Sequence, residues 1–310
     1  MRNVHISLFG TLEIQDSGGQ RIEVQPRRAQ ELLCYLLLYR DHFYEREKLA
    51  TLFWPDSSPA QSKRYLRQTL WQVQAALNHH TPPEKRLLLI DHERIGINPQ
   101  AAYWLDIAVF DQAFLAAKDK PGRTLTESTV GLLRQAIQLY QGDLLEGWYQ
   151  DWSIYERERY QGWYLALLDK LLGYSEAQEE YEAGLDYGEQ ILRYDRARER
   201  THRQLMRLHY RAGNRTQAIH QYETCVTALR EELNVGPDKR TTALYQQICN
   251  EPISTSAFNG VESAPIPAAL ENSEARILQQ LAQIQTALRH LQNQVTCLMQ
   301  SLAEQNTCPF

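Results

Sequence analysis

Between Ser58 and Asn78, arginine and glutamine side chains recur at a spacing that suits hydrogen bonding to the edges of DNA bases. At about 100° per residue, one side of an α-helix here carries four candidates for base contacts, which are Gln61, Arg64, Gln68 and Trp71. In the major groove, arginine can donate two hydrogen bonds to guanine, glutamine can pair with adenine, and an apolar ring can contact the thymine methyl. A solvated helix surface has the same composition, so the neighbouring elements must decide between the two interpretations.

The opposite side of this stretch is apolar and predicts a helix packed against a core. The apolar positions follow at steps of four, three and four residues, and they are Leu66, Leu70, Val73 and Leu77. Ser58 is a good N-cap, and Pro59 suits the first helical position, where a missing N–H costs nothing. The sequence therefore predicts a helix over residues 58–78 with one buried and one exposed side.

Cationic side chains near this helix are candidates for contacts with DNA phosphates and for a wing that touches the minor groove or the backbone. They are Arg27, Arg28, Lys63, Arg67, His92 and Arg94. The charge distribution agrees in direction. Residues 1–98 hold 13 Lys and Arg against 11 Asp and Glu, while the net charge of the whole chain is −5. The first third is therefore the more basic part of an acidic chain.

The elements around residues 58–78 follow the order of a winged helix-turn-helix. Short strands are predicted within residues 3–24, including a return strand at Arg21–Val24. Two helices follow, one from Ala29 to Leu37 and one from Leu49 to Phe53, and then the helix of 58–78. Residues 87–90 and 95–97 predict a hairpin around a polar tetrad. Strands, three helices and a hairpin predict a winged DNA-binding domain over residues 1–98.

From about residue 104 the sequence is helical and rich in aromatic residues, with no convincing strand. Helical periodicity recurs in seven segments, at about 104–118, 128–141, 151–175, 178–193, 199–212, 215–234 and 238–249. Leu205, Ala218, Tyr222 and Cys225 lie at the spacing of a tetratricopeptide-like helical pair. An all-α repeat domain is therefore predicted over residues 104–251, with a groove suited to protein or peptide contacts.

A dense aromatic cluster lies within this second domain. Its members are Tyr149, Trp152, Tyr155, Tyr160, Trp163 and Tyr164. Packing between helices is the first interpretation, and a pocket for a ligand or partner is the alternative.

The last fifth of the chain predicts a flexible linker followed by a coiled coil. Residues 252–270 contain three Pro, three Ser and one Gly, a composition typical of a flexible linker. In the predicted coiled-coil helix of residues 271–306, the heptad seam for self-association is Ile277, Leu281, Ile284, Leu288, Leu291, Val295, Leu298 and Leu302. A helix that packs back onto the second domain is the alternative.

Catalytic and metal-binding patterns are absent from the sequence. It contains no nucleotide-binding glycine loop, no His-Glu-x-x-His and no nucleophile elbow. The five cysteines form no Cys-x-x-Cys pair, and His79-His80 suggests no third ligand. We therefore expect no enzyme activity, no cofactor and no bound metal. Without a membrane-spanning run or a signal peptide, the cytoplasm is the expected location.

Several segments resemble the SARP-type bacterial transcriptional activators, which join an OmpR-type winged helix to a bacterial transcriptional activator domain. The matching segments are Leu8–Ile14, Arg27–Leu33, Lys48–Asp56, Tyr140–Leu145, Arg200–Met206 and Ala228–Pro237. The resemblance covers about residues 3–250. It implies an activator that binds direct-repeat promoter sites on double-stranded DNA and contacts RNA polymerase holoenzyme. The chain departs from many relatives at Gln72, Gln74 and Ala75, where arginines are common.

The fold expected from the whole sequence is mainly α. It consists of an N-terminal winged helix-turn-helix (α+β), an all-α tetratricopeptide-like domain and a C-terminal coiled-coil helix that makes a homo-oligomer. The expected function is a sequence-specific DNA-binding transcriptional regulator with no membrane partner. The alternative is a helical-repeat scaffold whose winged helix docks a protein, which the acidic total charge and the glutamine-rich helix favour.

Overall fold

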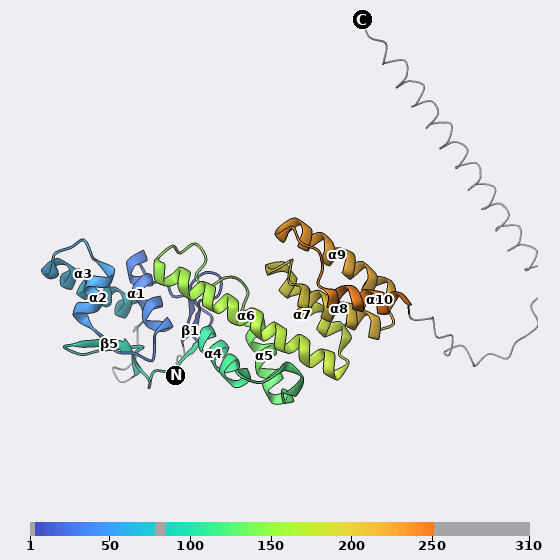
Figure 1. Cartoon of the computed structure of the whole chain (residues 1–310). Coiled ribbons are helices and arrows are strands. Elements are labelled where there is room, and N and C mark those ends of the chain that lie inside the picture. Colours follow the sequence, from blue (N-terminus) through green and yellow to red (C-terminus); the bar gives the residue numbers. More distant parts are fainter. Residues whose placement is uncertain (1–3, 78–84, 251–310) are drawn as a thin grey trace, which may run out of the picture. The chain divides into compact units, whose positions relative to one another are not determined.

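The computed structural model describes residues 4–77 and 85–250 (Figure 1). The predicted linker 252–270, the coiled-coil helix 271–306 with its heptad seam, and the pair His79-His80 lie outside the described residues. Within the described ranges, no helix is long and apolar enough to cross a membrane.

The first sheet joins the beginning of the chain to residues that follow the hairpin. Its central strand, β1 (Val4–Ser7), pairs antiparallel with β2 (Glu13–Gln15) and parallel with β6 (Tyr103–Leu105). The sequence prediction placed residues 104 and 105 in a helix and was wrong there, because three residues paired with a distant strand leave no local periodicity. The predicted return strand at Arg21–Val24 is reduced to an isolated bridge between Arg21 and Gln15.

Three helices and a second small sheet follow. The helices are α1 (Arg27–Leu38), α2 (Arg46–Phe53) and α3 (Pro59–Leu77). The sheet has the order β3 (Tyr44–Glu45), β5 (Arg94–Ile97) and β4 (Leu88–Ile90), and all its pairings are antiparallel. The predicted hairpin is confirmed, whereas the two-residue strand β3 was not predicted.

Seven α-helices fill the rest of the described chain. They are α4 (Asp106–Ala117), α5 (Glu127–Leu139), α6 (Asp151–Gln178), α7 (Tyr181–Tyr194), α8 (Glu199–Arg211), α9 (Arg215–Leu233) and α10 (Lys239–Asn250), with a short 3₁₀ helix η2 (Gly122–Thr124) between α4 and α5. The seven predicted helical segments are confirmed, and each end lies within three residues of the prediction. The described chain is therefore mainly helical, with small sheets near its N-terminus.

Helices α7 and α8 pack closely because two glycines of α7 place no side chain at the contact. A Cβ built on Gly188 of α7 would lie 2.4 Å from Cδ2 of Leu205, a fully buried side chain on α8. A Cβ built on Gly184, one turn earlier, would lie 2.8 Å from Cδ1 of Leu208. Close packing of α7 against α8 therefore depends on these two glycines.

Alanine substitutions at two glycines should change stability in opposite directions. We expect Gly188→Ala to lower the free energy of unfolding by about 1 kcal/mol, because overpacking costs more than the gain in helix propensity returns. Gly162→Ala on α6, where an added Cβ meets nothing within 4 Å, should raise it by about 0.5–1 kcal/mol. Urea denaturation followed by circular dichroism measures both values. A stabilising Gly188→Ala would contradict the packing argument.

Candidate nucleic-acid interface

Helix α3 has the two different sides that its sequence predicts. Leu66, Leu70, Val73 and Leu77 are all buried. The predicted base-contact residues are all exposed, and they are Gln61, Arg64, Gln68 and Trp71. Trp71, the largest of them, is 67% exposed. In the part of the chain that the structure describes, the side chains of Arg64 and Gln68 make no hydrogen bond or ion pair. Two hydrogen-bonding side chains, one of them charged, are thus free on the exposed side of α3.

Gln61 is exposed but already participates in the N-terminal cap of α3. Its Oε1 accepts hydrogen bonds from the backbone N–H and the hydroxyl of Ser58, at 3.3 and 3.1 Å. In return, the backbone N–H of Gln61 donates to the Ser58 hydroxyl at 3.4 Å. This reciprocal capping box satisfies groups that the first turn of a helix leaves unpaired. Gln61 is therefore held at the helix start, and Ser58 is the cap that the sequence predicts.

Four of the six predicted phosphate-contact residues surround one cavity between α2, α3 and the hairpin. The cavity has a volume of about 410 Å³, and the four are Lys63, Arg67, His92 and Arg94. Arg46 adds another cation, while Glu45, Glu47 and Glu93 supply carboxylates. The structure thus brings together residues of the helix and of the hairpin that lie up to 31 positions apart in the sequence.

Lys63 also forms an ion pair within the N-terminal part of the chain. Its Nζ lies 2.5 Å from Oε1 of Glu47 on α2, and the ammonium group lowers the pKa of that exposed carboxyl. Exposed pairs of this kind add little stability and break readily. Lys63 can therefore exchange Glu47 for another anion.

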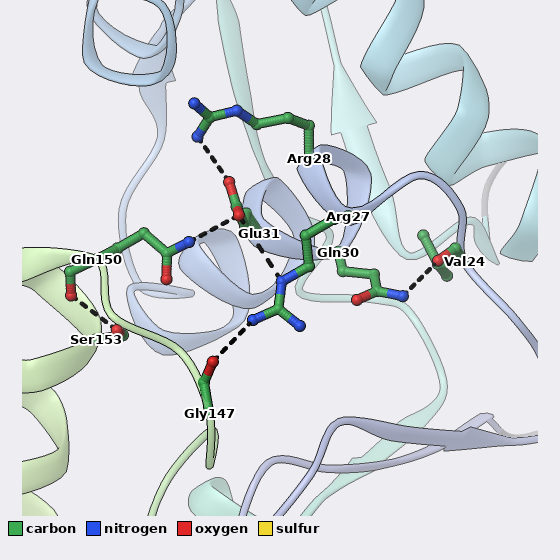
Figure 2. Close-up of polar contacts among 8 residues, drawn as sticks. All are labelled: Val24, Arg27, Arg28, Gln30, Glu31, Gly147, Gln150 and Ser153. Carbon is green, nitrogen blue, oxygen red and sulfur yellow. Dashed lines mark hydrogen bonds and ion pairs between the residues drawn. The ribbon is translucent and has the colours of Figure 1, made fainter.

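The other two predicted phosphate-contact residues lie at the start of α1, where they surround a buried carboxylate (Figure 2). Glu31 is only 5% exposed, and its Oε2 accepts a hydrogen bond of 2.7 Å from Arg28. Its Oε1 accepts another of 2.7 Å from the side-chain amide of Gln150 and lies 3.8 Å from Nε of Arg27. The contact joins α1 to the loop before α6.

The Arg27 guanidinium completes the contact between α1 and that loop. It stacks over the indole of Trp148, 4.0 Å from the ring centroid, and donates to the carbonyl of Gly147 at 3.5 Å. Cation–π contacts of this kind stabilise partly buried interfaces. Sequence reasoning missed Glu31, Trp148 and Gln150, because the contacts Glu31–Gln150 and Arg27–Trp148 join residues more than 100 positions apart and follow no local pattern.

A second set of contacts holds β1 against the helical part of the chain. Leu8 accepts a backbone hydrogen bond of 2.9 Å from Leu145, and the N–H groups of Leu8 and Phe9 donate to Oδ2 of Asp106 at 2.7 and 2.9 Å. The ring of Phe9 packs against Phe110, Tyr140 and Tyr160 at centroid distances of 4.9–5.6 Å. One continuous apolar core therefore runs from the first sheet into α4–α8.

The predicted aromatic cluster divides into two groups. Tyr160 and Tyr164 are buried, and Trp163 stacks on Phe114 at 4.2 Å, so these three rings pack between helices. Tyr149 and Tyr155 are instead 80% and 66% exposed. The packing interpretation holds for the first group and fails for the second.

Comparison with known proteins agrees with this architecture. Residues 105–249 match the family model of the bacterial transcriptional activator domain. Among solved structures, the chain is similar to Mycobacterium tuberculosis EmbR in complex with a low-affinity phosphopeptide. The identity is 18%, the TM-score is 0.57, and the alignment covers 82% of this chain and 67% of that one. No curated protein sequence matches the chain.

The family match confirms the predicted resemblance to SARP-type bacterial transcriptional activators over residues 105–249. Residues 105–249 thus match a domain of bacterial transcriptional activators, and that family is not a class of enzymes. At 18% identity, the likeness to EmbR concerns the fold alone.

Stability should depend on pH through Asp106. Burial raises the pKa of its carboxyl to about 6, although backbone N–H groups from Phe9, Leu8 and Ile107 oppose the shift. The ordinary pKa is lower, so the folded state binds the proton more tightly than the unfolded state. The free energy of unfolding should therefore fall as pH rises from about 4 to about 6, by on the order of 2 kcal/mol.

Asp106→Asn keeps an oxygen that accepts from the backbone N–H groups of Leu8 and Phe9, but it cannot titrate. The variant should lose this part of the pH dependence, even where its absolute stability is lower. Urea titrations of both proteins at intervals between pH 4 and pH 7 measure the slope. An identical slope in the two proteins would show that Asp106 does not titrate in this range.

Proposed function

We propose that the chain is a sequence-specific DNA-binding transcriptional activator. Residues 1–98 act as a winged helix-turn-helix, and the domain of residues 104–251 contacts RNA polymerase holoenzyme at promoters with direct-repeat sites. Residues 252–270 link this pair of domains to a coiled-coil helix, residues 271–306, that makes the homo-oligomer. The observation that carries the proposal is the exposed side of α3, where Arg64 and Gln68 have no partner in the described chain.

In this proposal α3 enters the major groove, and its side chains divide into two roles. Arg64 and Gln68 read base edges, with Trp71 against a thymine methyl. Gln61 has a secondary role, because its amide oxygen is held by Ser58. The element order supports this mode of docking, since the order of three helices followed by an antiparallel hairpin is that of winged helices.

The cations around the 410 Å³ cavity contact the phosphates on either side of the groove. Lys63 and Arg67 lie on the flank of α3, and His92 and Arg94 extend the contact along the hairpin. Arg28 adds a contact at the start of α1, where its side chain is half exposed. Arg27, stacked on Trp148, instead positions the start of that helix.

Two substitutions on α3 distinguish base contacts from phosphate contacts. Arg64→Ala should cost about 1–3 kcal/mol of binding free energy at the specific site and relax the preference at one base pair. Lys63→Ala should weaken specific and random DNA alike and reduce the salt slope by about one. Fluorescence anisotropy with fragments selected from random DNA, at several salt concentrations, measures both effects.

Arg211→Ala is the matched control, because Arg211 is an exposed arginine on α8, outside the proposed interface. Its affinity for DNA should equal that of the parent protein. Equal losses on specific and random DNA from Arg64→Ala would refute its assignment as a base contact. If the parent protein ignores DNA even at low salt, the alternative of a protein-docking scaffold replaces the proposal.

A further inference from the structure

A cavity lined by cations lies in the helical part of the chain, between η2, α6, α8 and α10. Its volume is about 750 Å³, within the range of sites for small organic ligands. Six cationic side chains line it, namely Arg123, Lys170, Arg200, Arg203, Arg207 and Arg240. Asp169 and Glu176 are the carboxylates of the lining. The lining is therefore strongly positive, although the whole chain carries a net charge of −5.

The two lining carboxylates pair with only some of these cations. Glu176 accepts a hydrogen bond of 2.7 Å from Arg207. Asp169 lies 3.5 Å from Arg200 and equally far from Arg198, outside the lining. Four cations of the lining are left without a lining carboxylate.

One more cation of the lining pairs with a carboxylate that lies outside the lining. Arg203 is 3.6 Å from Glu199, while Lys170 donates to a backbone carbonyl instead. Arg123 on η2 and Arg240 on α10 have no ion-pair partner anywhere in the described ranges. Two exposed guanidinium groups from different elements thus remain available to an anion at the rim of this cavity.

The oxygen of a buried side-chain amide in the same lining lacks a hydrogen-bond donor. Gln204 is only 5% exposed, and its Oε1 accepts no hydrogen bond from the residues that the structure describes. Its amide nitrogen is 3.5 Å from Glu176. An unsatisfied buried polar atom is costly, so the Gln204 side chain gains free energy if its oxygen turns toward a donor on a bound ligand. The cavity offers positive charge, and this acceptor lies buried in its wall.

We propose that this cavity binds a small phosphorylated organic anion of about nucleotide size. A phosphate carries more than one negative charge and three acceptor oxygens at neutral pH, so one group can engage guanidinium groups from two elements. Leu244 and Pro121 give apolar surface for the organic body. Arg203 and Glu176 have side chains only 20% and 18% exposed. Such recessed groups fit a small molecule that enters the cavity better than a flat protein surface.

The proposed ligand would connect α10 with η2 and α6, since these elements supply the cavity walls. A ligand that binds only the folded state raises the free energy of unfolding, and the increase grows with the logarithm of the ratio of ligand concentration to dissociation constant. Binding is therefore expected to raise the melting temperature of the full chain. The inference is independent of DNA binding, because none of these residues belongs to the α3 surface.

The test uses isothermal titration calorimetry and thermal unfolding of the full chain with inorganic pyrophosphate, ATP, adenosine, citrate and a hexaglutamate peptide. Pyrophosphate and ATP should bind and raise the melting temperature, ATP more tightly, while adenosine does neither. Arg123→Gln and Arg240→Gln should each weaken ATP binding about tenfold, and the double variant more. Both residues are exposed, so folded protein is expected, and far-UV circular dichroism checks it.

Arg211→Gln is the matched control, because it removes one arginine from α8 outside the cavity and should leave ATP affinity unchanged. The proposal is overturned if neither pyrophosphate nor ATP binds at millimolar concentration, or if folded Arg123→Gln and Arg240→Gln bind them as the parent does. Tighter binding of citrate than of both phosphate compounds would assign the site to carboxylates. Tighter binding of hexaglutamate would assign it to an acidic peptide, and either result refutes the proposal.

Discussion

Burial of β1 against the helical part of the chain is the interaction on which the described structure depends. The backbone N–H groups of Leu8 and Phe9, directly after β1, donate to the carboxylate of Asp106, and the Phe9 ring packs among rings from α4, α6 and the segment after α5. Neither the three-stranded first sheet nor α4 could bury its apolar surface alone. Because β6 leads directly into α4, the two parts share one core and are not joined by a free linker.

This shared core limits the orientations that α3 can adopt relative to the rest of the described chain. Helix α1 packs on α3 and, through Glu31 and Arg27, also contacts the loop that carries Trp148 and Gln150. Directly after α1, the hydroxyl of Tyr39 donates to the buried Glu156, which also pairs with Arg159. Breaking either contact would leave a buried carboxylate with fewer partners. The free-energy cost of that loss is larger than the stabilisation that an exposed ion pair gives. The contacts therefore make the orientation of α1, and of α3 on it, specific.

The elements with strong periodicity could be predicted from the sequence, and the contacts between distant segments could not. Leu66, Leu70, Val73 and Leu77 define a helix side by their spacing alone, and that spacing also exposes Arg64 and Gln68. Tyr103–Leu105 became a strand only because β1 lies beside it. Arg27 illustrates the same limit in the candidate site. Its place at the start of α1 suggested a phosphate contact, but Trp148, 121 positions later, determines where its guanidinium lies.

Some cations of the described chain pair with buried or recessed carboxylates, and others face no carboxylate. Where cations face buried or recessed carboxylates, as Arg159 faces Glu156 and Arg207 faces Glu176, they satisfy the fold and are poorly placed to bind another molecule. Arg64 on α3, and Arg123 and Arg240 at the cationic cavity, face no such carboxylate. Holding unpaired like charges near one another costs free energy, which neighbouring anions would recover. Surplus positive charge in an acidic chain is therefore better evidence for anionic partners than total charge, and it points to two separate surfaces of the molecule.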